Sequence, residues 1–273
     1  SIAEAPIAQT ESDYPVIVFS PGAGGSAEDS TAQAEELASQ GYVVVGINHT
    51  YDTLATGFSD GRIVEASPKL DDLSPEVLNE SIDIRAADAR FVLDQLELIN
   101  TSDPQGILTE HLDLEHVGIL GYSLGGATAI EVLAQDSRFD AGINMDGNLF
   151  KAEARAGSLT QPFMYLNNQV GIAQTPSRQT FYESLPNDAY NVTIDGTAHT
   201  SFSDLPFLVD SETLNSLADS DSITPIDPER GTTIINDYNV AFFDKYLKNE
   251  EESLLEAPSS DYPEVTFESN QEN

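Results

Sequence analysis

The sequence predicts an α/β fold, in which a mostly parallel sheet is covered by helices on both faces. Short apolar runs rich in β-branched residues alternate with segments of helical spacing, as in sheets that are buried on both sides. The chain has 273 residues, of which 40% are hydrophobic, and this is enough for a sizeable core. The sequence has neither an internal repeat nor a clear linker, so we expect one domain over residues 1–273.

The apolar runs define the expected strands in order. Residues 15–20 (PVIVFS) end in a glycine-rich turn, residues 42–48 (YVVVGIN) are β-branched, and residues 116–122 (HVGILGY) precede a helix. Further strands are expected at residues 141–146, 162–167 and 190–194, and helices at residues 31–39, 125–135 and 233–247. A long helix is expected over residues 77–100, where one stripe at helical spacing holds Ile82, Ala86, Ala89, Val92, Leu93 and Leu96.

Two long stretches interrupt this alternation, at about residues 51–75 and 203–228. Loops of this length in a compact domain usually have a function or are disordered. Both follow strand ends at the sheet edge where α/β proteins bind ligands. We therefore expect them to form pocket walls, with charged surface loops as the alternative.

The charge balance is extreme, because 11 basic residues face 47 acidic ones and the net charge is −36. Such a chain repels phosphate backbones, so nucleic acid is not an expected partner, and anionic membranes are disfavoured for the same reason. A surface poor in lysine stays soluble when salt screens its self-repulsion, which predicts adaptation to high salt. An ordinary acidic secreted protein is the alternative. Without cysteine, the chain has no disulfide, cysteine nucleophile or Cys-ligated metal.

The sequence also bears on location. No run of 18 apolar residues is present, so no transmembrane helix is expected. The chain begins at Ser1, and residues 1–13 contain no signal peptide pattern. A mature or trimmed extracytoplasmic form fits these features, and the cytoplasm of a high-salt organism is the alternative. The oligomeric state is left open.

The strongest motif is Gly121-Tyr-Ser-Leu-Gly125, which matches the Gly-x-Ser-x-Gly nucleophile elbow. An elbow needs a strand before the serine and a helix after it, and both are expected here. Its glycines let the adjoining backbones approach closely. We therefore predict that Ser123 is a nucleophile. The alternative is a glycine-rich turn with an idle serine.

The base must be one of four histidines. His116 begins the strand that ends near Ser123, and seven residues at about 3.3 Å each place it roughly 23 Å away. His111 lies further back still. His49 precedes the serine, against the order Ser, acid, His of this kind of site, and is expected beside or behind the pocket. His199 follows the last expected parallel strand and is the predicted base.

The third member should be an acid at a strand end between the serine and His199. Residues 162–168 end in the amides Asn167 and Asn168, which are expected to hydrogen-bond nearby groups. The strand directly after the elbow helix ends at Asp146, which is therefore the predicted acid. Asp195, four residues before His199, is the second choice for the acid. Its other interpretation is a turn residue.

Acyl transfer also needs donors for an oxyanion. Leu124 supplies one backbone N–H, because it follows the nucleophile. The second is expected from the small-residue turn after residues 15–20, with Ala23 preferred and Gly22 or Gly24 as alternatives. A phosphate-binding loop is disfavoured, since the Gly-Lys-Ser/Thr ending is missing.

These segments resemble the α/β-hydrolase family of plasma-type platelet-activating factor acetylhydrolases and their bacterial relatives, from about Pro15 to Leu247. Phe19-Ser-Pro-Gly-Ala-Gly resembles the family's Phe-Ser-His-Gly-Leu-Gly, and the elbow resembles Gly-His-Ser-Phe-Gly-Gly-Ala-Thr. His199, Phe202 and Asp204 resemble its His-x-x-Phe-x-Asp segment, and the Ile-Asp-Pro-Glu from Ile226 is also similar. In that family the acid follows the strand after the elbow helix, which implies the same choice, Asp146.

The resemblance has departures. Pro21 and Tyr122 stand where the family has histidines, and the chain begins almost directly at the oxyanion strand. An α/β-hydrolase fold with reduced N-terminal strands is therefore expected.

The function expected from these residues is hydrolysis of small to medium carboxylic esters by Ser123, His199 and Asp146, without metal or cofactor. A small-molecule ester is the expected partner. Aromatic side chains are candidates for the substrate pocket, namely Tyr51, Tyr122, Phe150 and Phe202. The same triad would also serve a thioesterase, peptidase, acyltransferase or polyester hydrolase, and a catalytically silent binding module is the alternative from another class.

Overall fold

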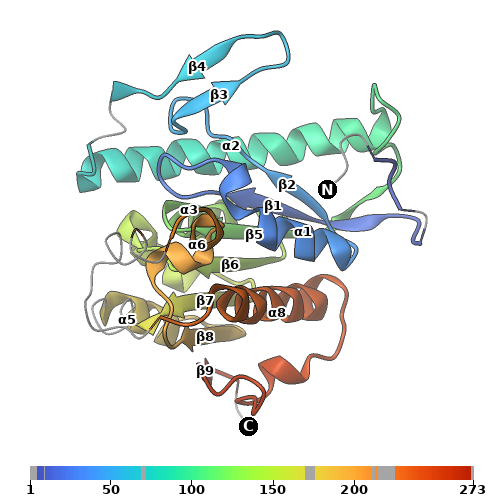
Figure 1. Ribbon diagram of the computed structural model, residues 1–273. Helices are drawn as coiled ribbons and strands as arrows, with labels where there is room; N and C mark the ends of the chain where they lie inside the picture. Colours follow the sequence, from blue (N-terminus) through green and yellow to red (C-terminus); the bar gives the residue numbers. More distant parts are fainter. Residues whose placement is uncertain are drawn as a thin grey trace.

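The computed structural model describes residues 5–8, 10–68, 72–169, 176–210, 213 and 225–271. Within them, seven strands form one sheet in the order β2-β1-β5-β6-β7-β8-β9 (Figure 1). All neighbours pair in parallel except β8 and β9, which are antiparallel. The strands are β1 (Tyr14–Ser20), β2 (Val43–Gly46), β5 (Leu112–Tyr122), β6 (Ala141–Met145), β7 (Phe163–Asn168), β8 (Ala189–Ile194) and β9 (Val265–Ser269).

The helices cover both faces of this sheet, as predicted. The α-helices are α1 (Thr31–Ser39), α2 (Pro75–Thr101), α3 (Leu124–Gln135), α5 (Pro176–Glu183), α6 (Leu205–Leu208) and α8 (Pro228–Leu247). Short 3₁₀ helices are η1 (Ala27–Ser30), η3 (Phe150–Ser158), η4 (His199–Phe202) and η5 (Ser253–Leu255). No helix among the described segments is both long and apolar enough to cross a bilayer.

Two apolar layers hold the sheet between its helices. Along β1, Val16 and Val18 belong to the layer shared with α2 and α3, whereas Ile17 and Phe19 belong to the layer shared with α1 and α8. This alternation is the period of two that a strand imposes. All four side chains are buried, which explains why β1 reads as a continuous apolar run.

Helix α2 forms where the apolar stripe predicts it. It begins with Pro75 as its first residue, a position at which proline's missing N–H costs no hydrogen bond. Five of the six expected stripe residues are buried: Ile82, Ala86, Ala89, Leu93 and Leu96. Val92 is partly buried and packs against the same layer. Helix α2 therefore packs on the same face of the sheet as α3, against Val16 and Val18 of β1.

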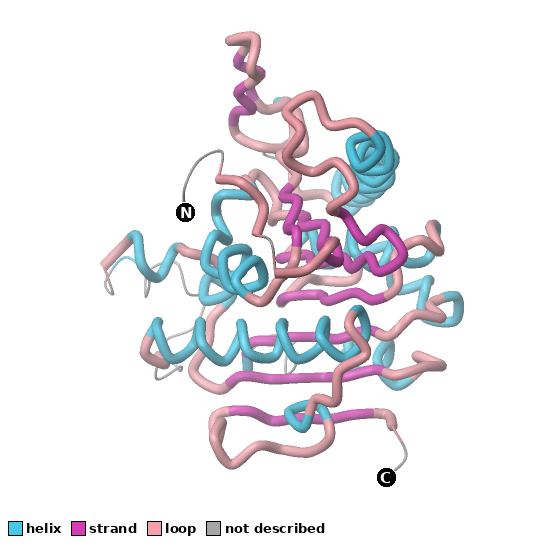
Figure 2. The backbone as a smooth tube through the Cα atoms, turned by 90° about the vertical axis from the view of Figure 1, so that its right-hand side faces the viewer, coloured by secondary structure: helices cyan, strands magenta, loops and turns pink. Residues whose placement is uncertain are grey.

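The first long excursion contains a hairpin that the sequence did not predict. Strands β3 (Ala55–Gly57) and β4 (Ile63–Glu65) pair antiparallel and stand apart from the central sheet, near α2 (Figure 2). In the second excursion, α6 is described, whereas residues 211, 212 and 214–224 lie outside the described residues. Strand β9, also not predicted, pairs along the edge of β8.

Candidate active site

Ser123 lies in a sharp turn between β5 and α3. Its backbone has φ 55° and ψ −119°, a conformation that residues with a side chain adopt rarely. A Cβ atom added to Gly121 would lie 1.9 Å from the Gly125 carbonyl oxygen, and one added to Gly125 would lie 1.9 Å from that of Ser20. Only glycine fits at either position. The strand, turn and helix required for a nucleophile elbow are therefore all present.

The three residues expected to act together are hydrogen-bonded in sequence. His199 Nε2 lies 3.0 Å from Ser123 Oγ, and His199 Nδ1 lies 2.6 Å from Asp146 Oδ2. Asp146 directly follows β6, and His199 begins η4 after β8. The Asp146 side chain is 2% exposed and that of His199 is 48% exposed. A buried acid thus holds a histidine whose other nitrogen faces a surface serine.

The carboxylate of Asp146 has further partners. The Asn168 backbone N–H and side-chain amide donate to its two oxygens at 3.2 and 2.6 Å. Arg178 Nη1 donates to Oδ1 at 3.2 Å and also to the side-chain oxygen of Asn167 at 3.1 Å. These donors satisfy both carboxylate oxygens and hold the Asp146 side chain in place beside His199. Hydrogen bonding by the two asparagines was expected, whereas Arg178 was not identified.

Tyr122 also contacts His199. Its ring lies 5.1 Å from the His199 ring with an interplanar angle of 30°, and its hydroxyl donates to the His199 carbonyl at 3.1 Å. Burial raises the pKa of Tyr122, so the phenol stays neutral and can donate. Tyr122 therefore packs against His199 and hydrogen-bonds to its backbone. The sequence had predicted instead that Tyr122 lines the substrate pocket.

The loop after β1 lies directly against the nucleophile. A Cβ added to Gly22 would lie 3.3 Å from Ser123 Cβ. Leu124 is the first residue of α3, where backbone N–H groups have no partner within the helix. Neither its N–H nor that of Ala23 donates a backbone hydrogen bond within the described part of the chain. Leu124 directly follows Ser123 in the chain, and Ala23 directly follows Gly22, which packs against Ser123.

A fully buried arginine anchors this loop. Arg85, on α2, donates from Nη1 to the Pro21 carbonyl at 2.6 Å and from Nη2 to the Gly22 carbonyl at 3.0 Å. Its Nε donates to Asp52 Oδ2 at 2.5 Å. In a planar trans peptide the C=O and the following N–H point in opposite directions. Holding the Gly22 carbonyl therefore also fixes the direction of the Ala23 N–H.

A second serine, histidine and aspartate are hydrogen-bonded behind the loop. His49 Nε2 lies 3.0 Å from Ser20 Oγ, and His49 Nδ1 lies 2.8 Å from Asp88 Oδ2. Ser20 and His49 are buried, at 0% and 1% exposure. Burial lowers the pKa of His49, which keeps its ring neutral near pH 7. With no access for substrate, this array holds the base of the loop, as expected for a histidine behind the site.

The remaining histidines and the second-choice acid lie elsewhere. His111 directly precedes β5 and His116 is its fifth residue, where Asp113 pairs with His116 at 2.6 Å. Asp195 lies in the turn after β8, where its backbone N–H donates to the Glu264 carbonyl. None of these three residues has a described contact with Ser123, His199 or Asp146.

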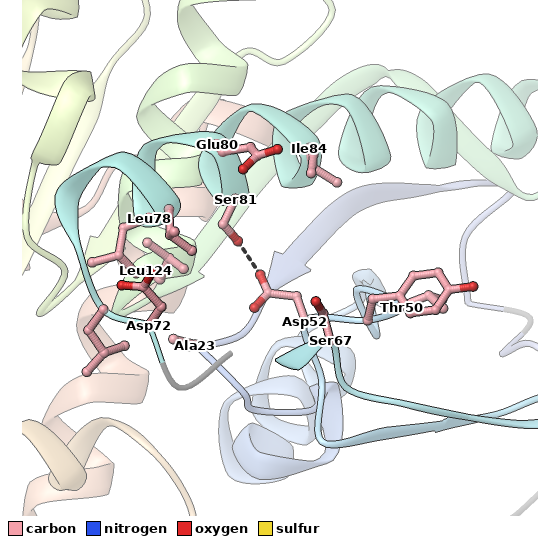
Figure 3. Close-up of a pocket in the computed structure, with 13 residues that line it drawn as sticks. Ala23, Thr50, Asp52, Ser67, Asp72, Leu78, Glu80, Ser81, Ile84 and Leu124 are labelled. Atoms are coloured by element: carbon pink, nitrogen blue, oxygen red, sulfur yellow. Dashed lines mark hydrogen bonds between the residues drawn. The ribbon is translucent and has the colours of Figure 1, made fainter. Parts of the chain in front are cut away.

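A cavity of about 290 Å³ opens beside the two oxyanion candidates (Figure 3). It lies between the N-terminal turns of α2 and the segment around the β3–β4 hairpin. Its lining residues are Ala23, Thr50, Tyr51, Asp52, Ser67, Asp72, Leu73, Val77, Leu78, Glu80, Ser81, Ile84 and Leu124. The first long excursion therefore forms a pocket wall. The described part of the second excursion does not line this cavity.

The four aromatic candidates for the pocket have different positions. Tyr51 lines the cavity and is 61% exposed. Phe150 packs against the apolar layer that includes α2 and α3. Phe202 is fully buried in the other layer, so its ring is a core side chain and offers no surface to a substrate. The sequence could not separate these cases, because buried and pocket aromatics have the same local pattern.

The described residues contain one acidic group with the spacing of metal ligands. Asp244, Glu250 and Glu252 have carboxylate oxygens within 4.8 Å of one another, after and at the end of α8. Lys248 Nζ already pairs with Asp244 at 2.7 Å. None of these three residues lines the cavity described above.

Comparison with known proteins gives one consistent picture. Residues 2–261 match a family model described as platelet-activating factor acetylhydrolase, isoform II. A probable 1-alkyl-2-acetylglycerophosphocholine esterase of Arthroderma benhamiae is 30% identical, over 93% of this chain and 66% of its own length. The platelet-activating factor acetylhydrolase of Cavia porcellus is 27% identical, over 95% of this chain and 65% of its own. The chain thus spans about two thirds of the length of these relatives.

A solved structure has the same fold. The ferulic acid esterase from Streptomyces cinnamoneus superposes with a TM-score of 0.80 and 32% identity, covering 93% of this chain and 74% of that one. The expected α/β-hydrolase fold is therefore confirmed. Because the family model matches nearly the whole chain, this protein belongs to the platelet-activating factor acetylhydrolase, isoform II family of ester hydrolases.

Proposed function

We propose that this chain hydrolyses carboxylic esters through an acyl-enzyme on Ser123. The observation that carries the proposal is the hydrogen-bonded order Ser123 Oγ, His199, Asp146, with contacts of 3.0 and 2.6 Å. A serine hydroxyl is a weak nucleophile until a neighbouring base accepts its proton. The three groups are within the distance at which that transfer takes place.

In the first half-reaction, Ser123 Oγ attacks the ester carbonyl carbon while His199 Nε2 accepts the hydroxyl proton. The imidazolium donates this proton to the leaving alcohol as the carbon–oxygen bond breaks. Asp146 holds the Nδ1–H tautomer and stabilises the positive ring. Water then attacks the acyl-enzyme with His199 as base, which releases the acid and restores the serine.

The carbonyl oxygen carries negative charge in each tetrahedral intermediate. We assign its stabilisation to the backbone N–H groups of Ala23 and Leu124. Removing a single donor of this kind costs about 10²–10³ in kcat in a serine protease. The hydrogen bonds from Arg85 to the loop support this assignment, because they fix one donor before substrate arrives.

The substrate class is proposed from chemistry that the relatives share. Their names specify an acetyl ester of an alkylglycerophosphocholine and an ester of ferulic acid. Both are carboxylic esters with an acyl group of small or medium size. We propose this bond, and this range of acyl groups, for the present chain.

The direct test combines labelling with turnover. A fluorophosphonate should label wild type once, and wild type should hydrolyse p-nitrophenyl acetate. Ser123→Ala should lose both, whereas Ser39→Ala, at an exposed serine at the end of α1, should keep both and so acts as the serine control. Thioester and amide substrates of the same acyl group measure the alternative activities. A folded wild type that neither reacts nor turns over any of them would be a binding module.

A further inference from the structure

The segment that carries His199 is bound, five residues further on, to the beginning of α1. The bond is made by Asp204, whose side chain is buried although it belongs to a charged residue. Its carboxylate accepts from the backbone N–H groups of Thr31 at 2.7 Å and Ala32 at 3.1 Å, and from the Thr31 hydroxyl. The Asp204 backbone N–H in turn donates to the Asp29 carbonyl at 2.8 Å. Four hydrogen bonds therefore join these two segments.

The residues that receive Asp204 directly follow the proposed oxyanion loop. The Gly25 N–H donates to the Gly22 carbonyl at 3.2 Å, and the Ser26 N–H donates to the Asp29 carboxylate at 2.7 Å. The Asp29 N–H returns a bond to the Ser26 carbonyl at 3.1 Å. Successive turns thus connect Gly22 to Asp29, and Asp204 binds at the end of this series.

The bond also completes the N-terminus of α1 in an unusual way. The first N–H groups of a helix have no partner within it, and a serine just before the helix commonly accepts from them. Ser30 occupies that position and makes no such side-chain hydrogen bond within the described part of the chain. Asp204, 173 residues after Thr31, supplies the acceptor instead. A local residue could cap the helix equally well, so the distinct effect of Asp204 is to join two distant segments.

These two segments carry groups that must act on the same ester carbon. His199 transfers the proton, and the loop at Ala23 presents a proposed oxyanion donor. Misplacing a catalytic group by about 1 Å can lower a rate about 100-fold. Resting on the proposed function, we propose that Asp204 is a positioning residue, which sets the distance between His199 and the oxyanion loop.

The leaving group of the substrate provides a readout for this role. p-Nitrophenolate leaves without a proton at neutral pH, whereas ethoxide needs the proton that His199 Nε2 donates. Ethyl acetate and p-nitrophenyl acetate form the same acetyl-enzyme, so the ratio of their kcat/KM values reports acylation alone. A smaller folded fraction lowers both values equally and leaves this ratio unchanged. A displaced histidine lowers the value for ethyl acetate more.

The test compares wild type with Asp204→Ala and Asp204→Asn. Asp204→Ala should lower kcat/KM about 100-fold for ethyl acetate and about tenfold for p-nitrophenyl acetate, so the ratio falls about tenfold. Asp204→Asn keeps one acceptor oxygen for the end of α1, and asparagine is a good helix cap. Its ratio should therefore fall only about threefold. Circular dichroism verifies the fold of each variant.

Asp103 offers a matched control at the other edge of the sheet. Its carboxylate also accepts from three backbone N–H groups, those of Gln105, Ile107 and Leu108 at 3.0, 2.8 and 2.9 Å. It lies in the loop before β5, whose 11 residues at about 3.3 Å each span roughly 36 Å before Ser123. Asp103→Ala should lower the urea midpoint, as Asp204→Ala does, and leave the ratio unchanged.

Failure of this inference differs from failure of the proposed function. If wild type hydrolyses neither acetate, the ester hydrolase proposal fails. If wild type hydrolyses both and folded Asp204→Ala keeps the wild-type ratio, Asp204 stabilises α1 and does not position His199. An equal fall of the ratio in Asp103→Ala would also overturn the inference. Should Asp204→Ala not fold, Asp204→Asn decides, because a wild-type ratio in that variant contradicts the positioning role.

Discussion

The guanidinium of Arg85 holds the carbonyl oxygen of Gly22 at 3.0 Å, and this contact joins helix α2 to the loop that faces the nucleophile. The same side chain bridges to Asp52, in the segment that packs on the other side of the loop. Gly24 also pairs with Thr53 as an isolated bridge. The loop is therefore fixed from two directions, which an oxyanion donor needs if it is to bind charge without reorganising.

We expect Arg85→Lys to lower kcat about 10- to 100-fold while KM changes little, because the donor is misdirected rather than removed. Lysine keeps the positive charge beside Asp52 and loses the planar fork that reaches both carbonyls. Steady-state kinetics with p-nitrophenyl acetate separate the two constants, and circular dichroism verifies the fold. An unchanged kcat in a folded variant would remove Arg85 from the positioning of the site.

Asp146→Asn should lower kcat about 10⁴-fold with an intact fold, as expected when the histidine loses the acid that sets its tautomer. Asp195→Asn should stay within about twofold of wild type, because surface substitutions away from a site have small effects. The pair decides between the two acids considered from the sequence. The assignment would be reversed if Asp195→Asn were the inactive variant.

Arg138 should make an acid-dependent contribution to stability. It donates to Asp136, Asp94 and Glu97, and its hydrogen bond holds the pKa of Asp136 below the ordinary 3.8. A carboxyl with a depressed pKa stabilises the fold above its unfolded pKa, and this stability is lost as pH falls through the folded value. Arg138→Gln should therefore lower the free energy of unfolding by about 1 kcal/mol at pH 6. The difference should vanish near pH 2.

Urea unfolding at pH 2, 4 and 6 measures that effect. Arg62→Gln is the control, since Arg62 and Asp60 form an exposed pair on the β3–β4 hairpin. Its effect should be close to zero at every pH. A deficit of Arg138→Gln that does not change with pH would show that packing, and not the ion pairs, explains it.

The net charge of −36 predicts that salt stabilises the protein. Raising KCl from 0.1 to 1 M shortens the Debye length from about 10 Å to about 3 Å, which screens repulsion among surface carboxylates. The free energy of unfolding should rise over this range at neutral pH. Urea titrations at fixed pH provide the measurement, and a midpoint that does not move would contradict the salt adaptation expected from the composition.

The elements that the sequence predicts well are those whose signal is local. The α1 bounds agree to the residue, and strands β1, β5, β6, β7 and β8 agree within a few residues, because each is a buried apolar run bounded by turns. Strand β9 was missed because it is a half-exposed edge strand whose partner, β8, lies about 70 residues earlier. Pairing at that separation leaves little local pattern.

The residues of the candidate site also differ in whether their signal in the sequence is local. Ser123, His199 and Asp146 were predicted from the elbow motif, from their order along the chain and from their places at strand ends. All three signals can be read from the sequence. Arg85 and Arg178 were missed, since arginine is rarely buried and its partners come from distant segments. A signal for Arg85 did exist, because it falls within the apolar stripe between Ile82 and Ala89. A charged residue at a core position indicates a buried partner.

Helix α2 contributes both to the oxyanion loop and to the cavity wall, and this limits how the cavity can change over evolution. Arg85 holds the oxyanion loop, and Leu78, seven residues earlier on the same face of the helix, lines the cavity together with Ile84. A shift of the helix backbone to enlarge the pocket would also displace the loop. Lineages in which this cavity changes size should therefore vary the side chains on α2 and the length of the segment between Tyr51 and Leu73, while the path of the helix itself stays constant.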